Sequence, residues 1–267
     1  YNIKKKYISL FPKNMLKLRV VLDVGDGVGA FMGKVLKRLG CRVTLITGPR
    51  FKYNPTPGNI KTLCEISKNT NAGFAVDGDC DRLAVVDDNG KVVDINKLII
   101  TLSRGEKIVT TFETTRMLEK YARVRRVRTG DTFISSSLKK SNAFLGVEAS
   151  GHFLWKDWLL YSDPIYTAYN ILLRIKNHGK LSDMLSKIPD IYTRRFAVEY
   201  KEGVLHTLKS RLNANKAGDG FELSLFDCHV FFRKSQTEEK VRFTVEGKNY
   251  NACIKVENEL KRIFKCS

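Results

Sequence analysis

A short apolar segment, Ala72–Val76, runs directly into a loop that holds three acids, Asp77–Arg82. The apolar segment contains no charged residue, which is typical of a strand that is buried on both faces of a sheet. Open α/β sheets bind their ligands at the carboxyl ends of their strands. The two segments together therefore predict an α/β fold with a ligand site in the acidic loop.

The acidic loop offers the ligands of a divalent-cation site. Asp77, Asp79 and Asp81 stand at alternate positions and repel one another unless a cation binds between them. Carboxylate oxygens suit Mg²⁺ or Ca²⁺ better than Zn²⁺. Arg82 follows directly and can bind a phosphate beside the same metal. We expect Mg²⁺ next to a phosphorylated ligand, and a solvated acidic turn is the alternative.

A calcium site of the EF-hand type fits this segment poorly. The sixth position of an EF-hand loop must be Gly and the twelfth must be Glu, but Arg82 and Asp88 stand there. The residues beyond Arg82 form two apolar runs around Asn89 and Gly90, which is a hairpin signature and not an exiting helix. Mg²⁺ is therefore the predicted cofactor.

The composition is that of a globular protein with room for two or three small domains. The chain has 267 residues, of which 43% are hydrophobic. No apolar run approaches the ~20 residues that span a bilayer, and no signal-peptide pattern opens the chain. The six cysteines form no CxxC pair, which favours reduced thiols and a cytoplasmic location.

The net charge is unusually positive for an enzyme that acts on small anionic substrates. It is +19 at pH 7, and the isoelectric point is about 9.7. Basic residues gather at Lys4–Lys6 and again at Arg123–Arg128. Such clusters are commonly solvated surfaces, but the imbalance also fits a polyanionic partner such as RNA.

Alternating apolar runs and turn residues predict repeated α/β units followed by a different third part. In the first unit, we expect strands or helices at residues 18–22, 31–39, 41–47, 59–68 and 72–76. In the second unit, we expect them at residues 95–103, 107–111, 113–121, 123–127 and 163–176, with a further helix after residue 132. In the third part, we expect strands around 223–232 and 241–246 and a helix at 250–264.

The predicted fold class is α/β, with two doubly wound α/β domains followed by a small α+β domain. We place these domains at residues 1–94, 95–190 and 191–267. A glycine-rich loop at Asp23–Gly29 lacks the GxGxxG spacing of a dinucleotide site, so NAD binding is not expected.

Four segments in chain order resemble motifs of the α-D-phosphohexomutase family, which includes phosphomannomutase, phosphoglucomutase and phosphoglucosamine mutase. They are Asp77–Arg82, Val127–Ile134, Gly146–His152 and Arg233–Arg242, with weaker similarities at Leu22–Gly27 and Tyr53–Pro57. The resemblance covers nearly the whole chain. It implies the fold of that family and the Mg²⁺-dependent interconversion of hexose 1-phosphates and 6-phosphates.

The resemblance also implies roles for individual residues of the metal and sugar loops. Arg82 would be catalytic, because with Mg²⁺ it would neutralise charge on the transferring phosphoryl group. Glu148 and Ser150 would bind sugar hydroxyls, and glycines on both sides of this loop let the backbone approach a ligand closely. His152 is a further candidate of the same loop.

The segment at 233–242 resembles the phosphate-binding loop of the family. Arg233, Ser235, Thr237 and Arg242 would bind the phosphate of the substrate, since a forked cation and two hydroxyls suit one phosphate monoester. The loop departs from the family pattern at two positions.

These departures leave the activity open. Gln236 replaces the usual Gly and Glu239 the usual Pro, which adds bulk and a negative charge near a phosphate. The family's phosphoserine motif, which belongs to an earlier domain, has no match in this sequence. Asp131 stands where several phosphomannomutases carry His, which favours the glucosamine or archaeal branches.

Two hypotheses therefore remain. In the first, the chain is a phosphohexomutase that acts on a hexose phosphate once an N-terminal donor domain, absent from this sequence, is supplied. In the second, it is a catalytically inactive derivative that binds a polyanion such as RNA through its basic surface. The intact acidic loop favours the first hypothesis, and the missing serine motif and the +19 charge favour the second.

Overall fold

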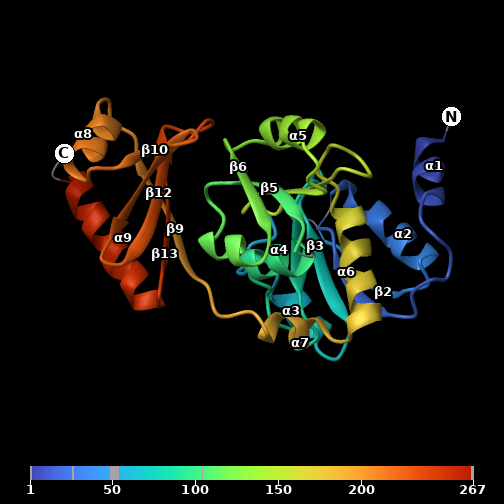
Figure 1. Cartoon of the computed structure of the whole chain (residues 1–267). Helices are drawn as coiled ribbons and strands as arrows, with labels where there is room; N and C mark the ends of the chain where they lie inside the picture. Colours follow the sequence, from blue (N-terminus) through green and yellow to red (C-terminus); the bar gives the residue numbers. More distant parts are fainter. Residues whose placement is uncertain (1, 26, 49–53, 104, 266–267) are drawn as a thin grey trace.

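The structure, a computed structural model, describes residues 2–25, 27–48, 54–103 and 105–265 of the chain. It contains three β-sheets in chain order, and the third sheet with its helix α9 forms a separate lobe at the left of Figure 1. The weak similarities at Leu22–Gly27 and Tyr53–Pro57 include residues 26 and 53, which lie outside the described residues.

The first sheet has the strand order β2-β1-β3-β4. Strand β1 pairs in parallel with β2 and β3, and β3 pairs antiparallel with β4. Its strands are β1 (Arg19–Asp23), β2 (Arg42–Ile46), β3 (Ala72–Val76) and β4 (Leu83–Val86). Its helices are α1 (Ile3–Ser9), the 3-10 helix η1 (Val28–Phe31), α2 (Met32–Arg38) and α3 (Lys61–Ser67).

The second sheet repeats this topology with the order β6-β5-β7-β8. The first three strands are again parallel, and the last pair is again antiparallel. Its strands are β5 (Lys107–Thr111), β6 (Arg123–Val127), β7 (Leu145–Val147) and β8 (Phe153–Trp155). Its helices are α4 (Ile95–Ser103), η2 (Arg116–Lys120), α5 (Asp131–Lys140), α6 (Pro164–His178) and α7 (Leu181–Ser186).

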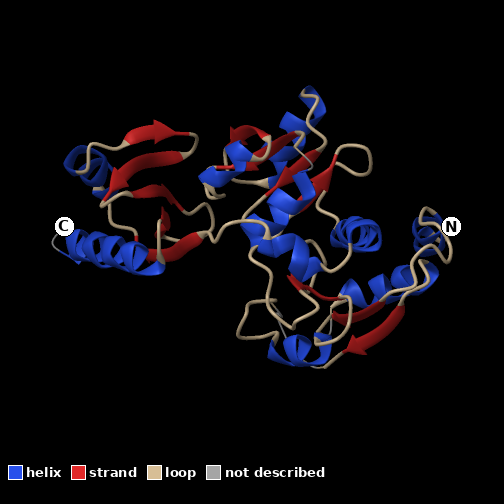
Figure 2. Cartoon of the chain, turned by 60° about the horizontal axis from the view of Figure 1, so that its bottom comes forward, coloured by secondary structure: helices blue, strands red, loops and turns tan. Residues whose placement is uncertain are grey.

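The third sheet is antiparallel throughout, in the order β10-β11-β12-β13-β9. Figure 2 shows helix α9 lying along this sheet at the C-terminal end of the molecule. Its strands are β9 (Tyr192–Glu199), β10 (Asn215–Ala217), β11 (Gly220–Leu225), β12 (Cys228–Lys234) and β13 (Lys240–Gly247), and its helices are α8 (Val204–Arg211) and α9 (Tyr250–Lys265).

Helices cover both faces of the parallel strands because side chains alternate along a strand. In β1, Leu22 packs in the main hydrophobic core, which includes Leu36 of α2, whereas Val21 packs in a second cluster with Leu63 of α3. The main core continues from Phe74 in the first sheet to Phe153 in the second, so the two α/β units share it. The third sheet has a core of its own. The predicted α/β class is confirmed.

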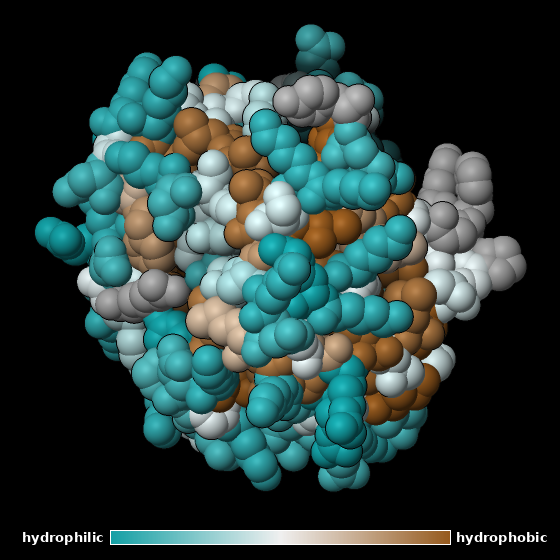
Figure 3. All heavy atoms as spheres, turned by 90° about the vertical axis from the view of Figure 1, so that its right-hand side faces the viewer, coloured by the Kyte–Doolittle hydropathy of each residue, from teal (hydrophilic) through white to brown (hydrophobic). Residues whose placement is uncertain are grey.

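One detail differs from the sequence-based expectation. The prediction of a regular helix at residues 113–121 was wrong, because the structure has only the 3-10 helix Arg116–Lys120 there. Thr115 begins it from an extended conformation and accepts a hydrogen bond from the Met117 main-chain N–H at 3.0 Å. The basic segment Lys4–Lys6 lies within helix α1, on the side of the molecule shown in Figure 3, where hydrophilic side chains stand among hydrophobic ones.

Asp163 anchors α1 and α6 to the body of the molecule. Its buried carboxylate accepts hydrogen bonds from the main-chain N–H groups of Ile165 and Tyr166, both at 3.0 Å, as the N-cap of α6. It also accepts the hydroxyl of Tyr7 at 2.6 Å and the indole N–H of Trp158 at 2.7 Å. Burial and then the neighbouring Asp163 carboxylate raise the pKa of Tyr7, so its phenol stays protonated.

We expect Asp163→Ala to lower the free energy of unfolding by about 2–4 kcal/mol, because it removes a helix cap and leaves buried donors unpaired. Urea unfolding followed by circular dichroism measures this loss. Asp157→Ala, an exposed acid nearby in the sequence, is the control and should change stability by less than about 0.5 kcal/mol. Equal effects of both variants would contradict the anchoring role.

Candidate functional site

The acidic loop lies between the antiparallel strands β3 and β4, and its first acid is fully buried. One carboxylate oxygen of Asp77 accepts the main-chain N–H groups of Asp81 and Arg82, both at 3.1 Å. The other oxygen forms an ion pair with the Nε of Arg82. Burial alone would raise the pKa of Asp77, but the hydrogen bonds from Arg82 outweigh it and lower that pKa. Asp77 is therefore held as a carboxylate.

The carboxyl group of Asp81 receives less stabilisation from its neighbours than that of Asp77. Its Oδ1 atom has no access to solvent and receives no hydrogen bond within the described part of the chain. Burial and then the charge of Asp77 raise the pKa of Asp81. The nearest cationic nitrogens are Nε2 of His152 at 3.4 Å and Nε of Arg82 at 3.6 Å, and neither donates a hydrogen bond to this oxygen. A bound cation or a proton would relieve the remaining cost of burying it. Oxygens of Asp77, Asp79 and Asp81 all lie within 4.8 Å of one another, so the three acids could hold a metal ion.

The loop Glu148–His152 lies between β7 and β8, the position in the second sheet that corresponds to the acidic loop in the first. Glu148 is buried and accepts the main-chain N–H of Gly130 at 2.8 Å and the hydroxyl of Ser150 at 3.0 Å. Gly130 binds Oε1 of Glu148, whereas Oε2 accepts from Ser150 and also lies 3.2 Å from Nδ1 of His152. Burial would raise the pKa of Glu148, but the hydrogen bond with His152 and that from Gly130 lower it.

The two loops contact each other directly. The Leu83 main-chain N–H donates to the carbonyl of Gly151 at 3.1 Å, and Nε2 of His152 lies 3.4 Å from Oδ1 of Asp81. Gly151 has φ +99°, and a Cβ atom there would lie 3.0 Å from the carbonyl oxygen of Leu83. Glycine is therefore required where the loops meet. The structure brings the predicted metal and sugar residues together at one place.

The loop between β12 and β13 approaches the same place from the third sheet. The side-chain amide of Gln236 donates to the carbonyl of Thr129 at 3.1 Å, next to the Gly130 amide that binds Glu148. Ser235 is buried and accepts a hydrogen bond from Nε of Arg242 at 3.3 Å.

The remaining residues of this loop are exposed. Thr237 lies on the surface, and Glu239 pairs with Lys234 at 3.2 Å. The Arg242 guanidinium also lies 3.1 Å from Glu238.

Arg233 pairs with Arg242 across strands β12 and β13, but its guanidinium is already engaged by acids. Its side chain is 8% exposed, and its Nε donates to Glu113 at 2.8 Å. Asp219 lies 3.9 Å away on the same guanidinium. In this arrangement, Arg233 joins the third sheet to the loop after β5, and its charge is balanced by acids.

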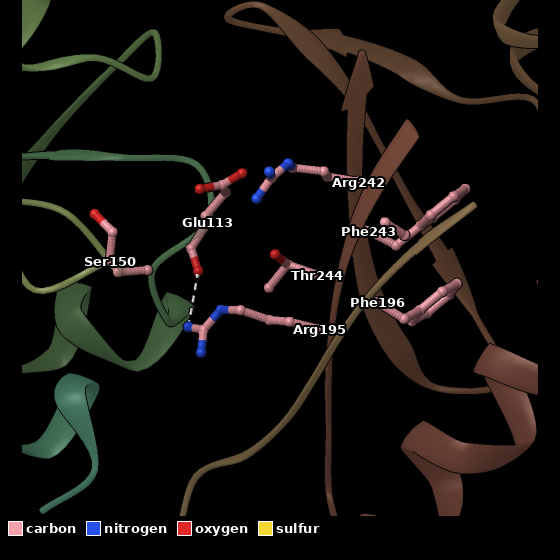
Figure 4. A pocket seen from close by; sticks show the side chains of 9 residues that line it. Glu113, Ser150, Arg195, Phe196, Arg242, Phe243 and Thr244 are labelled. Carbon is pink, nitrogen blue, oxygen red and sulfur yellow. Dashed lines mark hydrogen bonds between the residues drawn. The ribbon is translucent and has the colours of Figure 1, made fainter. Parts of the chain in front are cut away.

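A cavity of about 350 Å³ separates the sugar loop from the third sheet (Figure 4). Ser150 and Glu113 border it on one side, and Arg195, Arg242 and Thr244 border it on the other. Arg195 also lies 3.4 Å from the main-chain carbonyl of Glu113. The volume is that of a small-molecule site, and both cations can face an anionic ligand.

Sequence reasoning missed Arg195 and Glu113 as members of this cavity. A signal for Arg195 was present, since the large apolar residues Phe196, Val198 and Tyr200 stand at every second position, as in a strand with one buried face. No local pattern marks Glu113, because only the docking of the third sheet brings it to the cavity.

Comparison with known proteins identifies both α/β units. Residues 2–90 match phosphoglucomutase/phosphomannomutase alpha/beta/alpha domain II, and residues 95–192 match domain III of the same family. The probable phosphoglucosamine mutase of Methanothermobacter thermautotrophicus is 30% identical over 263 residues, which cover 86% of this chain and 58% of that protein. The chain thus spans about three fifths of the length of this relative.

Two solved structures share the fold. A phosphoglucomutase/phosphomannomutase family protein from Burkholderia thailandensis superposes with a TM-score of 0.83 at 22% identity, over 100% of this chain and 65% of that one. The N-acetylphosphoglucosamine mutase of Aspergillus fumigatus, in complex with GlcNAc-6P and magnesium, superposes with a TM-score of 0.63 at 15% identity, over 96% and 62%.

The lowered pKa of Glu148 predicts a pH-dependent contribution to stability. Such a carboxylate stabilises the fold above its unfolded-state pKa, and the contribution is lost as the pH falls through the folded-state pKa. We expect Glu148→Gln to cost about 1–3 kcal/mol near neutral pH and progressively less below about pH 4. Urea unfolding across this range tests it, with the exposed Glu106→Gln as control. A cost independent of pH would contradict the assignment.

Proposed function

Because the chain belongs to the phosphoglucomutase/phosphomannomutase family, we propose that it provides the metal-binding and sugar-phosphate-binding parts of a phosphohexomutase. Such an enzyme moves a phosphoryl group between the 1- and 6-positions of a hexose. The observation that supports this most strongly is the contact between the acidic loop and the sugar loop. A phosphoryl group at Asp81 and a sugar hydroxyl at Glu148 would then be neighbours, since His152 touches both residues.

Mg²⁺ is the metal we propose for Asp77, Asp79 and Asp81. Three carboxylates suit a hard cation, and the solvent-inaccessible Oδ1 of Asp81 receives no hydrogen bond among the described residues, with His152 and Arg82 nitrogens only at 3.4 and 3.6 Å. When bound, Mg²⁺ would neutralise charge on the phosphoryl group during transfer. Arg82 uses its Nε on Asp77 and remains one-third exposed, so its outer N–H groups can bind the same phosphoryl oxygens.

The sugar would lie between the sugar loop and the third sheet. Glu148 is ionised and can accept hydrogen bonds from ring hydroxyls, while Ser150 and His152 hold its carboxylate in position. Arg195 and Arg242, across the cavity of about 350 Å³, would bind the phosphate at the other end of the substrate.

The phosphate-binding loop contributes in different ways, through Ser235, Thr237 and Arg233. Ser235 orients Arg242 through a hydrogen bond, and exposed Thr237 would donate to the phosphate. Arg233 reaches the phosphate only if its ion pair with Glu113 opens, so in the present geometry it supports the cavity wall.

A hexosamine phosphate is the substrate we propose to test first. The curated relative from Methanothermobacter is named a probable phosphoglucosamine mutase, and the Aspergillus structure holds GlcNAc-6P. The phosphoryl carrier would be supplied by a polypeptide segment other than these 267 residues, because the family's phosphoserine motif has no match here. We also propose that the three domains are separated after residues 94 and 190.

We expect Asp79→Asn and Asp81→Asn each to weaken Mg²⁺ or Mn²⁺ binding by about tenfold or more, since each removes a charged ligand. Isothermal titration calorimetry measures the affinity directly. Asp157→Asn removes the same charge from an exposed site and should leave the affinity within about twofold. Unchanged affinity in both loop variants would refute the metal assignment.

We expect the chain alone to show no turnover of glucosamine 1- and 6-phosphates in a coupled assay with a hexose bisphosphate activator. Adding the phosphorylated donor domain of a relative should restore measurable turnover, and Glu148→Ala should then abolish it. Turnover of the unaided chain at about 1–10³ per second, the ordinary enzyme range, would show that a residue within it carries the phosphoryl group.

A further inference from the structure

A second cavity, of about 420 Å³, lies between strand β6, helix α5 and the β10–β11 turn. We call it the basic groove. Its walls are Phe112, Arg125, Arg126, Val127, Arg128, Phe133, Ser136, Ser137, Lys140 and Gly218. Among the described residues, none lines both this groove and the cavity beside the sugar loop, and no acid lines the groove.

Three of its four cations have no carboxylate partner. Arg126 pairs with Glu119 at 2.9 Å and also donates to main-chain carbonyls, so it has a structural role. By contrast, no carboxylate of the described chain lies within 4 Å of Arg125, Arg128 or Lys140, and all three are exposed. Concentrated positive charge without counter-charges attracts a polyanion.

The positive charge extends beyond the groove. Strand β6 is an edge strand of the second sheet, and Arg123 and Arg125 lie two residues apart on its exposed side. At the other wall, Lys139 precedes Lys140 in the last turn of α5. A ligand with several phosphates in a row can therefore follow the groove from one end to the other.

An aromatic surface lies among these cations. The guanidinium of Arg128 stacks 4.7 Å from the centre of the Phe133 ring, and Phe133 is 37% exposed. Exposed aromatic rings and guanidinium planes are the surfaces on which unpaired bases stack. A large exposed aromatic side chain is otherwise unfavourable in water.

We propose that the basic groove binds single-stranded nucleic acid, with phosphates on Arg125, Arg128 and Lys140 and a base stacked at Phe133. Edge-strand cations and one aromatic surface suit a flexible strand, whose bases are free to stack. A duplex presents its phosphates but keeps its bases stacked inside, so it can use only the cations. The proposal does not depend on mutase activity.

The test is fluorescence anisotropy with the full chain and labelled RNA of about 12 nucleotides, with a DNA strand and an RNA duplex of the same sequence alongside. With three phosphates neutralised, affinity should fall about 20-fold between about 50 and 200 mM salt. The single strands should bind more tightly than the duplex. A duplex that binds as well as the single strand, or no binding at the lower salt, would overturn the proposal.

A charge-matched pair of variants separates a local site from overall charge. The triple variant R125A/R128A/K140A should lose about tenfold or more in affinity and most of its salt dependence. The triple variant K4A/K5A/K6A removes the same three charges from exposed positions of α1, at the opposite end of the molecule from the third sheet (Figure 1), and should change affinity less than about twofold. Equal losses in the two variants would mean that binding reflects net charge alone.

The stacking contact has its own variant. Phe133→Leu keeps an apolar side chain but removes the ring, and should weaken single-strand binding about fivefold or more while leaving duplex binding unchanged. Circular dichroism and Mn²⁺ affinity, which depends on other residues, confirm that each variant is folded. An unchanged single-strand affinity in Phe133→Leu would refute the stacking role.

Discussion

The arrangement of the candidate site depends on one contact, between the hairpin loop of the first sheet and that of the second. The Leu83 N–H and the Gly151 carbonyl form its hydrogen bond, and His152 and Asp81 add an electrostatic contact. Both sheets end in an antiparallel fourth strand, so each carries such a hairpin at the same position. The shared core that includes Phe74 and Phe153 keeps these two hairpins facing each other. This junction brings together metal and sugar ligands that belong to two different sheets.

The distribution of charge within the junction decides where a cation can bind. Five carboxyl groups gather there in a chain of net charge +19: those of Asp77, Asp79, Asp81, Asp131 and Glu148. Asp77 and Glu148 receive enough hydrogen bonds to remain ionised despite burial. Asp81 and Asp131 do not, and burial raises the pKa of both. His152 and Arg82, at 3.4 and 3.6 Å, offset the buried charge of Asp81 only in part, so a cation held by the three loop acids would stabilise its ionised form.

The sequence predicted the parts of the site that lie within one loop. Asp77–Arg82 and Glu148–His152 are each short segments between adjacent strands, so spacing and resemblance were enough to identify them. The contacts of Arg233 and Arg195 with Glu113 could not be predicted, because they join residues about 80 to 120 positions apart through the docking of the third sheet. The helix predicted at 113–121 failed for a related reason. Thr115 and Arg116 bind Glu246 of β13, which fixes a conformation that local propensity does not favour.

The loop after β5 connects the third sheet to both proposed ligand sites. Thr115 and the Arg116 main chain donate to Glu246, and Glu113 accepts from Arg233. Phe112 also stacks on Phe231 of β12, with ring centroids 5.6 Å apart, so both polar and apolar contacts attach the third sheet. Phe112 and Glu113 are consecutive, yet Phe112 borders the basic groove and Glu113 borders the cavity beside the sugar loop. No described side chain borders both cavities, so in this loop the main chain joins their two walls. A nucleic acid in the groove and a sugar phosphate in the cavity can therefore bind through separate side chains, while any movement of this loop would affect both sites together.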